Sequence, residues 1–292
     1  MKILLLGANG QVGWELQRAL APLGEVLAFD RAGVDLADTD ALAHAVRALA
    51  PQAIVNAAAY TAVDRAEAEP ELAKAVNAEA PARLAELARA VDAWLLHYST
   101  DYVFDGGGQR PWREGDPAAP LNEYGRSKLA GEIAIRDSGC RHLILRTSWV
   151  YSARGGNFIR SMLRLGAQRP RLGVVDDQVG APTGAELIAD TSAHLLRFLR
   201  QQSEAGGTYH LAAAGETSWR DYACHVFDLA RACGAELVVE EVAGISTAEY
   251  PAAAPRPRNS RLDCSLLQET FGLAMPPWQV GVARVLREIL NA

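Results

Sequence analysis

The first residues of the chain combine a short apolar segment with a glycine-rich turn. Residues 1–6 are typical of a buried strand, and Gly7, Gly10 and Gly13 follow directly before a helical pattern over 14–20. Glycine permits a tight turn and close approach of the backbone, while the amides that open the helix attract a phosphate group. In a strand–turn–helix context, this spacing predicts that the three glycines belong to a dinucleotide-binding site.

Strand-like and helical segments alternate along the first half of the chain. Apolar runs lie at 2–6, 26–29, 53–56, 94–98 and 142–147, separated by alanine-rich amphipathic stretches. Such alternation favours an α/β fold with a Rossmann-type doubly wound parallel sheet. We expect residues 1–150 to form a dinucleotide-binding domain.

Glycine and proline become frequent after Trp149, and the pattern of segments becomes less regular. Residues 151–292 are therefore expected to form mainly a smaller α/β lobe that binds the substrate. Helices expected near 184–201 and 277–290 would return to the first domain or cover it, so the boundary is discontinuous.

Composition limits the function classes. The 292 residues carry a formal net charge of −6, which offers no basic surface for nucleic acid, and no apolar run approaches the roughly 20 residues needed to cross a bilayer. The four cysteines are scattered without C-x-x-C spacing, and the first residues are too short for a secretory signal. We expect a cytoplasmic enzyme acting on a small molecule.

Acidic residues follow the second expected strand. Asp30 comes directly after it, where a Rossmann-type fold places a carboxylate against the adenosine ribose hydroxyls, and this favours NADH. The adjacent Arg31 is suited to the additional phosphate of NADPH, because a guanidinium pairs well with phosphate. The sequence leaves the preference between NADH and NADPH open.

Tyr124 and Lys128 lie four residues apart, so on a helix their side chains share one face. A phenol has an ordinary pKa of about 10, and a nearby positive charge draws that pKa down. The pair predicts general acid catalysis. Thr100 follows the apolar run 94–98 and therefore places a hydroxyl at the carboxyl end of a strand, where ligands bind in open α/β sheets.

Six segments carry a resemblance to a known family. They are VNAAAYTAVD at 55–64, STDYVFDG at 99–106, YG-x-x-KL-x-GE at 124–132, RTSWVY at 146–151, DQ-x-G-x-PT at 177–183 and RP-x-x-S-x-L at 256–262. Together they resemble the extended short-chain dehydrogenase/reductase family, and within it the reductases of dTDP-linked keto-sugars. The resemblance covers nearly the whole chain.

This resemblance implies reduction of the 4-keto group of a dTDP-linked 6-deoxy-hexulose by NADH or NADPH, giving dTDP-L-rhamnose for surface polysaccharide. It implies that Tyr124 donates a proton to the developing alkoxide, that Thr100 hydrogen-bonds the same oxygen, and that Lys128 binds the nicotinamide ribose. The positions that match cofactor contacts are Gly10, Gln11, Val12, Asp30, Asp35, Leu36, Ala59, Tyr60 and Thr61. Those that match substrate contacts are Thr100, Asp101 and Trp149. Beyond the resemblance, a guanidinium is well shaped for a diphosphate, so Arg256 or Arg258 is a candidate for that contact. The alternative is that both belong to an exposed basic loop that solubilises a proline-rich stretch.

Three glutamates match metal-binding positions of the same family. Glu15, Glu186 and Glu288 come from distant segments, and carboxylates suit Mg²⁺, so the resemblance implies a magnesium site at the subunit contact of a homodimer. The alternative is that they are solvated charges on helix surfaces.

Two rival functions come from related classes. One is a sugar-nucleotide epimerase or 4,6-dehydratase, but in the dehydratases an Asp-Glu pair follows the threonine, whereas here Asp101 is followed by Tyr102. The other is a non-catalytic NADP-binding subunit that resembles the regulatory subunit of methionine adenosyltransferase and has a partner enzyme.

Overall fold

Six parallel strands form the central sheet of the computed structural model, which describes residues 1–291. Their order across the sheet is β10-β5-β4-β3-β1-β2, and every neighbouring pair is parallel. The doubly wound α/β fold expected from the sequence is therefore confirmed. The strands are β1 (Lys2–Leu6), β2 (Glu25–Phe29), β3 (Ala53–Asn56), β4 (Trp94–Thr100), β5 (His142–Thr147) and β10 (Gly207–His210).

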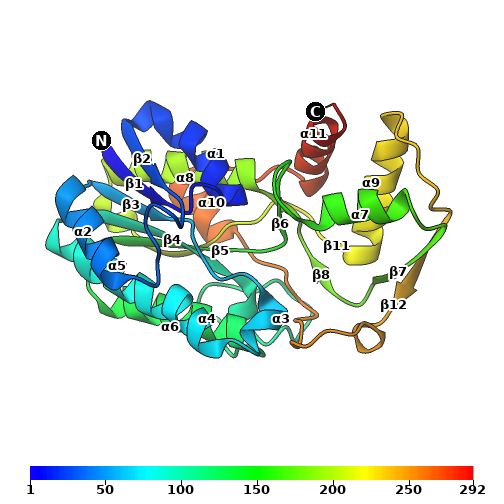
Figure 1. The fold of residues 1–292 in the computed structure, drawn as a ribbon, viewed down its shortest axis with the longest axis horizontal. Helices are drawn as coiled ribbons and strands as arrows, with labels where there is room; N and C mark the ends of the chain where they lie inside the picture. The colour runs from blue at the N-terminus through cyan, green and yellow to red at the C-terminus, as the bar shows by residue number, and fades with distance from the viewer. Residues whose placement is uncertain (292) are drawn as a thin grey trace.

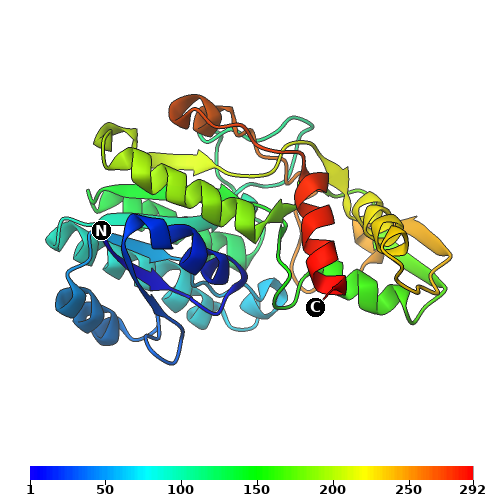
Figure 2. The ribbon, with the colours of Figure 1, turned by 90° about the horizontal axis from the view of Figure 1, so that it is seen from above.

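Helices cover both faces of this sheet (Figures 1 and 2). One face packs against α1 (Gln11–Leu20), α8 (Ala185–Leu199) and α10 (Ser265–Phe271), whose apolar side chains share a core with the strands. The other face packs against α2 (Thr39–Leu49), α5 (Ala80–Ala90) and α6 (Glu123–Asp137). Because both faces are buried, β1, β3 and β5 are mostly apolar.

A smaller lobe lies to the right of the sheet in Figure 1 and has its own apolar core. Its helices are α7 (Phe158–Gly166), α9 (Trp219–Ala232) and α11 (Trp278–Leu290). Its short strands pair as β6 (Val150–Tyr151) with β9 (Thr183–Gly184), β7 (Arg171–Val175) with β12 (Glu241–Ile245), and β8 (Val179–Gly180) with β11 (Thr217–Ser218).

Two features of the sheet differ from the expectations. β4 continues through Ser99 and Thr100, so the predicted catalytic hydroxyl belongs to the strand itself. β10 was not predicted from the sequence, and it adds the sixth strand beside β5 from the second half of the chain. Its four residues, Gly-Thr-Tyr-His, include no aliphatic side chain apart from the methyl group of the threonine, so they carry no hydrophobic run. None of the helices within residues 1–291 has both the length and the apolar character needed to span a membrane.

Three short helical segments connect β3 to α5. They are α3 (Val63–Ala66), α4 (Pro70–Lys74) and a π-helical turn over Ala75–Glu79. The π turn lies against α6 and below the loop that follows β3. It carries Asn77, which accepts a hydrogen bond from the Tyr60 amide in that loop.

Candidate active site

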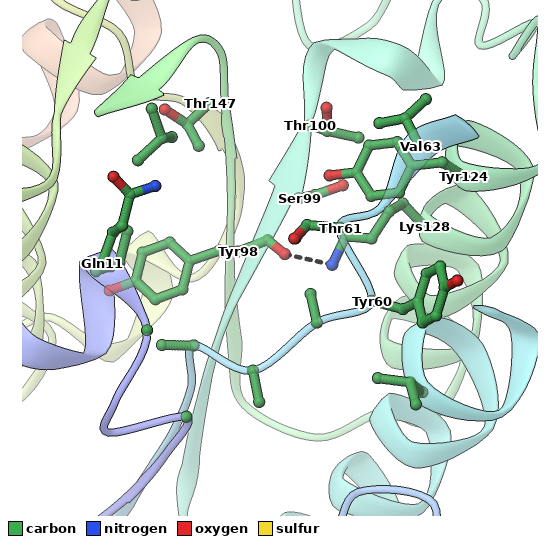
Figure 3. Close-up of a pocket in the computed structure, with 18 of the residues that line it drawn as sticks. Gln11, Tyr60, Thr61, Val63, Tyr98, Ser99, Thr100, Tyr124, Lys128 and Thr147 are labelled. Atoms are coloured by element: carbon green, nitrogen blue, oxygen red, sulfur yellow. Dashed lines mark hydrogen bonds between the residues drawn. The ribbon is translucent and has the colours of Figure 1, made fainter. Parts of the chain in front are cut away.

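A cavity of about 860 Å³ opens at the carboxyl ends of the central strands. It is lined by the glycine turn, the ends of β2 to β5, the first turns of α6 and Trp219 from the lobe. Figure 3 shows Gln11 and Tyr98 on one side of this cavity and Tyr124 and Lys128 on the other. Of the predicted contacts, those that line it are Gly7, Gly10, Gln11, Val12, Asp30, Arg31, Asp35, Leu36, Ala59, Tyr60, Thr61, Thr100, Asp101, Tyr124, Lys128 and Trp149.

The glycine turn leaves room for a diphosphate because side chains are excluded from it. Gly7 has φ +84°, and a Cβ there would lie 2.6 Å from the amide nitrogen of Ala58. α1 begins after Gly10, and no side chain within residues 1–291 caps its first amides. Those amides and the positive end of the helix dipole are therefore available to an anion. This cradle fits the diphosphate of a dinucleotide.

The acidic residues beyond β2 form a fixed network at the far end of the cavity. Asp30 accepts hydrogen bonds from the amides of Ala32 and Gly33 through Oδ1 and from Asn9 Nδ2 through Oδ2, at 3.1, 3.0 and 2.7 Å. Arg31 pairs with Asp35 at 3.1 Å and is largely exposed. Arg31, Asp30 and Asp35 thus line the cavity at the place where an adenosine ribose is expected.

Tyr124 and Lys128 lie on the first turns of α6, which begins at Glu123 because Asn122 caps the amide of Gly125 at 2.8 Å. The phenol, Lys128 and the hydroxyl of Thr100 face the same cavity (Figure 3). Burial raises the pKa of Tyr124 to about 12, and a hydrogen bond with Thr100 opposes this rise. We expected Lys128 to lower the pKa of Tyr124, whereas burial raises it.

The amine of Lys128 contacts β4. Its Nζ donates to the carbonyl oxygen of Tyr98 at 2.6 Å, as Figure 3 shows, and lies 3.1 Å from Nε2 of His97. Burial lowers the pKa of Lys128 to about 8, although Glu132 one turn further along α6 opposes the change. The lysine is therefore anchored to β4 rather than paired with the phenol.

Asp101 is a second buried acid in the cavity. It accepts a hydrogen bond from Thr100 Oγ1 at 3.1 Å, while its Oδ2 is buried without a partner within residues 1–291. Burial raises the pKa of Asp101 to about 6. Because Asp101 lines the cavity, its carboxylate is suited to accept a hydrogen bond from a ligand hydroxyl.

Trp149 forms the lobe side of the cavity together with Trp219. The two rings stack with centroids 3.6 Å apart, and Trp149 has φ +49°, an unusual backbone conformation for a bulky residue. Gly180 also packs against the Trp149 ring, where a Cβ would lie 2.8 Å from Cε2. Trp219 and Gly180 thus hold the Trp149 ring in place at the cavity.

Comparison with known proteins identifies the family of this chain. Residues 1–291 match the family model described as "RmlD substrate binding domain". A dTDP-4-dehydrorhamnose reductase from Escherichia coli K12 is 51% identical over 295 residues, covering 100% of this chain and 99% of that protein. The chain belongs to the dTDP-4-dehydrorhamnose reductase family.

Solved structures of dTDP-4-dehydrorhamnose reductases share the fold of this family member. The protein from Clostridium acetobutylicum has a TM-score of 0.91 at 34% identity, with all of both chains covered. The protein from Bacillus anthracis, solved in complex with NADP, has a TM-score of 0.89 at 36% identity, covering 98% of this chain and 99% of that one.

Asn77 supports the cavity of this dTDP-4-dehydrorhamnose reductase family member, and the sequence reasoning missed it. Its side chain accepts from the amide of Tyr60 at 2.9 Å and donates to the Tyr60 carbonyl and to Ser127 Oγ at 3.0 Å each. It lies in the π turn, a feature often found at functional sites. Asn77 thus ties the loop after β3 to α6, and no local motif announces it.

Three predicted contacts, Gly13, Arg256 and Arg258, lie outside the cavity lining. Arg258 pairs with Asp177 at 3.6 Å. Gly13 is buried in α1, and a Cβ there would lie 2.0 Å from the carbonyl oxygen of Gly7, so this glycine is required for close packing of the turn. Arg256 does not line the cavity, because it forms an ion pair with Asp64 at 2.7 Å. Its Nη1 is buried without a partner among the described residues.

The magnesium site expected from three glutamates is not supported in this member of the dTDP-4-dehydrorhamnose reductase family. Within residues 1–291, no three His, Cys, Asp or Glu side chains form a group able to hold a metal ion. Glu15 pairs with Arg18 at 3.5 Å, Glu288 is exposed, and Glu186 is buried. Burial raises the pKa of Glu186, and the charges of the other two glutamates add to that rise. The three carboxylates thus face one region without converging on one point.

Proposed function

We propose that this chain reduces the 4-keto group of dTDP-4-dehydro-6-deoxy-L-mannose with NAD(P)H, giving dTDP-L-rhamnose. The observation that carries the proposal is that the Tyr124 phenol, the Thr100 hydroxyl and Lys128 face one cavity beside the glycine turn. The 51% identity to a dTDP-4-dehydrorhamnose reductase over the full chain supports the same reaction.

The residues of the first domain fit a nicotinamide dinucleotide. The amides at the start of α1 would hold its diphosphate, Asp30 and Arg31 its adenosine ribose, and Lys128 its nicotinamide ribose. Bound there, the reduced cofactor supplies the hydride for the carbonyl carbon. The loop over Ala59–Thr61, held by Asn77, would form one wall of this channel.

Proton donation is the task of Tyr124 in this proposal. The phenol gives its proton to the oxygen on which negative charge develops, and Thr100 donates a hydrogen bond to that oxygen. Because burial holds the pKa of Tyr124 at about 12, the phenol carries its proton throughout the neutral range. A positive charge on Lys128 would stabilise the phenolate that remains.

The lobe would bind the sugar nucleotide. We infer that Asp101 accepts from a sugar hydroxyl and that the Trp149 ring, held by Gly180 and Trp219, limits where the sugar ring lies. We also infer that residues 151–291, without the helices that return to the sheet, form this substrate lobe. Arg256 would meet the diphosphate only after release from Asp64.

The test is consumption of NADPH, and in parallel NADH, by the purified chain with dTDP-6-deoxy-L-lyxo-4-hexulose, together with analysis of the sugar-nucleotide product. Tyr124→Phe should lower kcat by about 10²- to 10⁴-fold while sugar binding is largely kept. Tyr222→Phe is the matched control, because that hydroxyl is also buried but has no hydrogen-bond partner within residues 1–291. Tyr124→Phe activity within a few-fold of the parent would exclude the assignment.

A negative result would point to the rival functions. Cofactor binding without oxidation, together with a stoichiometric partner enzyme in a pull-down, would favour the regulatory-subunit alternative. The homodimer and the cytoplasmic location stay predictions. Measuring the molar mass of the purified protein in solution by light scattering would test the homodimer.

A further inference from the structure

A chain of hydrogen bonds leads from the backbone just after β3 to the proposed catalytic lysine. The amide of Ala58 donates to Asn56 Oδ1 at 3.2 Å, and Asn56 Nδ2 lies 3.1 Å from Nδ1 of His97. On the other side of the ring, Nε2 of His97 lies 3.1 Å from Nζ of Lys128. Asn56 and His97 are direct neighbours across β3 and β4.

His97 is neutral in this position. It is 1% exposed, and burial lowers the pKa of His97 well below its ordinary value, with a further lowering from the charge of Lys128. The charged group that acts on Lys128 is Glu132, also on α6, and it favours the ammonium form. A neutral imidazole has one ring nitrogen that donates and one that accepts.

The direction of these hydrogen bonds decides which ring nitrogen of His97 carries the proton. The Ala58 amide can only donate, so Asn56 must present its oxygen to that amide and its NH₂ group to His97. Nδ1 of His97 must then accept, which leaves the ring proton on Nε2, directed at Lys128. An ammonium has three donors and no acceptor, whereas a neutral amine has a lone pair that accepts from Nε2–H. Every donor in this series of hydrogen bonds therefore has an acceptor only when Lys128 is neutral.

We propose that His97 is a positioning residue for Lys128: Asn56 fixes its tautomer, and the Nε2–H of His97 favours the neutral amine of the lysine. This inference rests on the proposed function of Lys128 beside Tyr124. The same amine donates one hydrogen to the Tyr98 carbonyl and keeps another for a ligand in the cavity. The arrangement therefore sets the pH above which the enzyme loses the positive charge that supports Tyr124.

The first test reads the tautomer directly and requires no turnover. In the full chain labelled with ¹⁵N-histidine, long-range ¹H–¹⁵N spectra distinguish a protonated from an unprotonated ring nitrogen. We expect His97, assigned by its absence in His97→Leu, to be neutral with the proton on Nε2. Asn56→Asp replaces the amide donor by a carboxylate that only accepts, so the proton should move to Nδ1. A proton on Nδ1 in the parent, or a cationic ring, would overturn the proposal.

The second test reads the consequence for catalysis. With Nε2 as an acceptor, the ammonium of Lys128 gains a hydrogen bond, so the alkaline limb of the kcat profile in Asn56→Asp should move upward by about one pH unit. The new carboxylate also acts by its charge alone, and Asn56→Asp in the His97→Leu background isolates that part. A shift of equal size in both backgrounds would refute the role of His97. Absence of turnover in the parent, with the Nε2 proton present, would instead refute the proposed function.

Discussion

Replacing Arg146 by methionine should destabilise the fold far more than replacing Arg136, although both arginines pair with Glu132. Arg146 on β5 donates to both carboxylate oxygens of Glu132, at 2.9 and 2.7 Å, and the two side chains are 4% and 0% exposed. Arg136 donates to the same carboxylate at 3.1 Å but is 38% exposed. The pair of variants compares a buried and a half-exposed partner of one charge.

The loss in the free energy of unfolding depends on what happens to the carboxylate of Glu132 once Arg146 is removed. Removing one partner of a buried ion pair typically costs about 3–5 kcal/mol, because the other charge stays buried. Glu132 can escape part of this cost by taking up a proton. With an ordinary pKa of 4.5, protonation at pH 7 costs about 3.4 kcal/mol at about 1.36 kcal/mol per pH unit. We therefore expect Arg146→Met to lower the free energy of unfolding by about 3 kcal/mol, and Arg136→Met by less than about 1 kcal/mol.

The pH dependence gives this prediction its sign. Burial raises the pKa of Glu132, but the hydrogen bonds and charge of Arg146 outweigh burial and hold the pKa below its ordinary value. A lowered pKa stabilises the fold above the ordinary value of the unfolded chain, and this stability is lost as the pH falls through the lowered pKa. In Arg146→Met the carboxylate is the destabilising form, so the difference from the parent should shrink between pH 7 and pH 5.

Urea denaturation at pH 7 and at pH 5, followed by circular dichroism with a common m value, measures both effects. Equal losses for Arg146→Met and Arg136→Met, or a difference from the parent that does not change with pH, would refute the reasoning. Glu132 lies one turn beyond Lys128 on α6, so the same experiment tests how firmly the catalytic helix is fixed to the sheet.

Three further changes address the cavity. Gly7→Ala should weaken dinucleotide binding at least tenfold in calorimetric titration and should destabilise the fold. The reason is that φ of Gly7 is +84° and that the added Cβ would lie 2.6 Å from the backbone. Gly115→Ala is the control, because the space around its Cβ is open, and it should change neither binding nor stability. Since burial raises the pKa of Asp101 to about 6, kcat/KM for the sugar nucleotide should fall below pH 6 as this acceptor is protonated, and Asp101→Asn should lack that acid limb. Arg31→Ala should weaken NADPH binding about 3- to 10-fold more than NADH binding. Salt should reduce this difference because the guanidinium is exposed. Equal losses for both cofactors would show that Arg31 does not bind the ribose phosphate.

Local patterns were sufficient for much of the fold and the cavity. The turn that begins at Gly7 and the pair Tyr124 and Lys128 depend on neighbours within a few residues, so their spacing in the sequence is their spacing in space. The strands up to β5 were also predictable, because a strand buried on both faces is apolar throughout.

Features that depend on distant partners were not predictable in this way. Asn77 acts through Tyr60 and Ser127, which are 17 and 50 residues away in the chain. Arg256 was expected at a ligand diphosphate, but Asp64, 192 residues distant, holds it. The pKa of Tyr124 depends on burial and on where the amine of Lys128 points, and neither follows from a four-residue interval.

The sixth strand has a consequence for how the chain reaches its native state. β10 pairs with β5 only after segment 148–206, which contains half of the lobe, has been synthesised. Until then β5 is an open edge whose unpaired amides and carbonyls invite pairing with other chains. Long-range parallel pairing of this kind closes a large loop and is intrinsically slow. During synthesis, the first 150 residues would therefore wait as an aggregation-prone intermediate that needs the arrival of Gly207–His210 to complete its sheet.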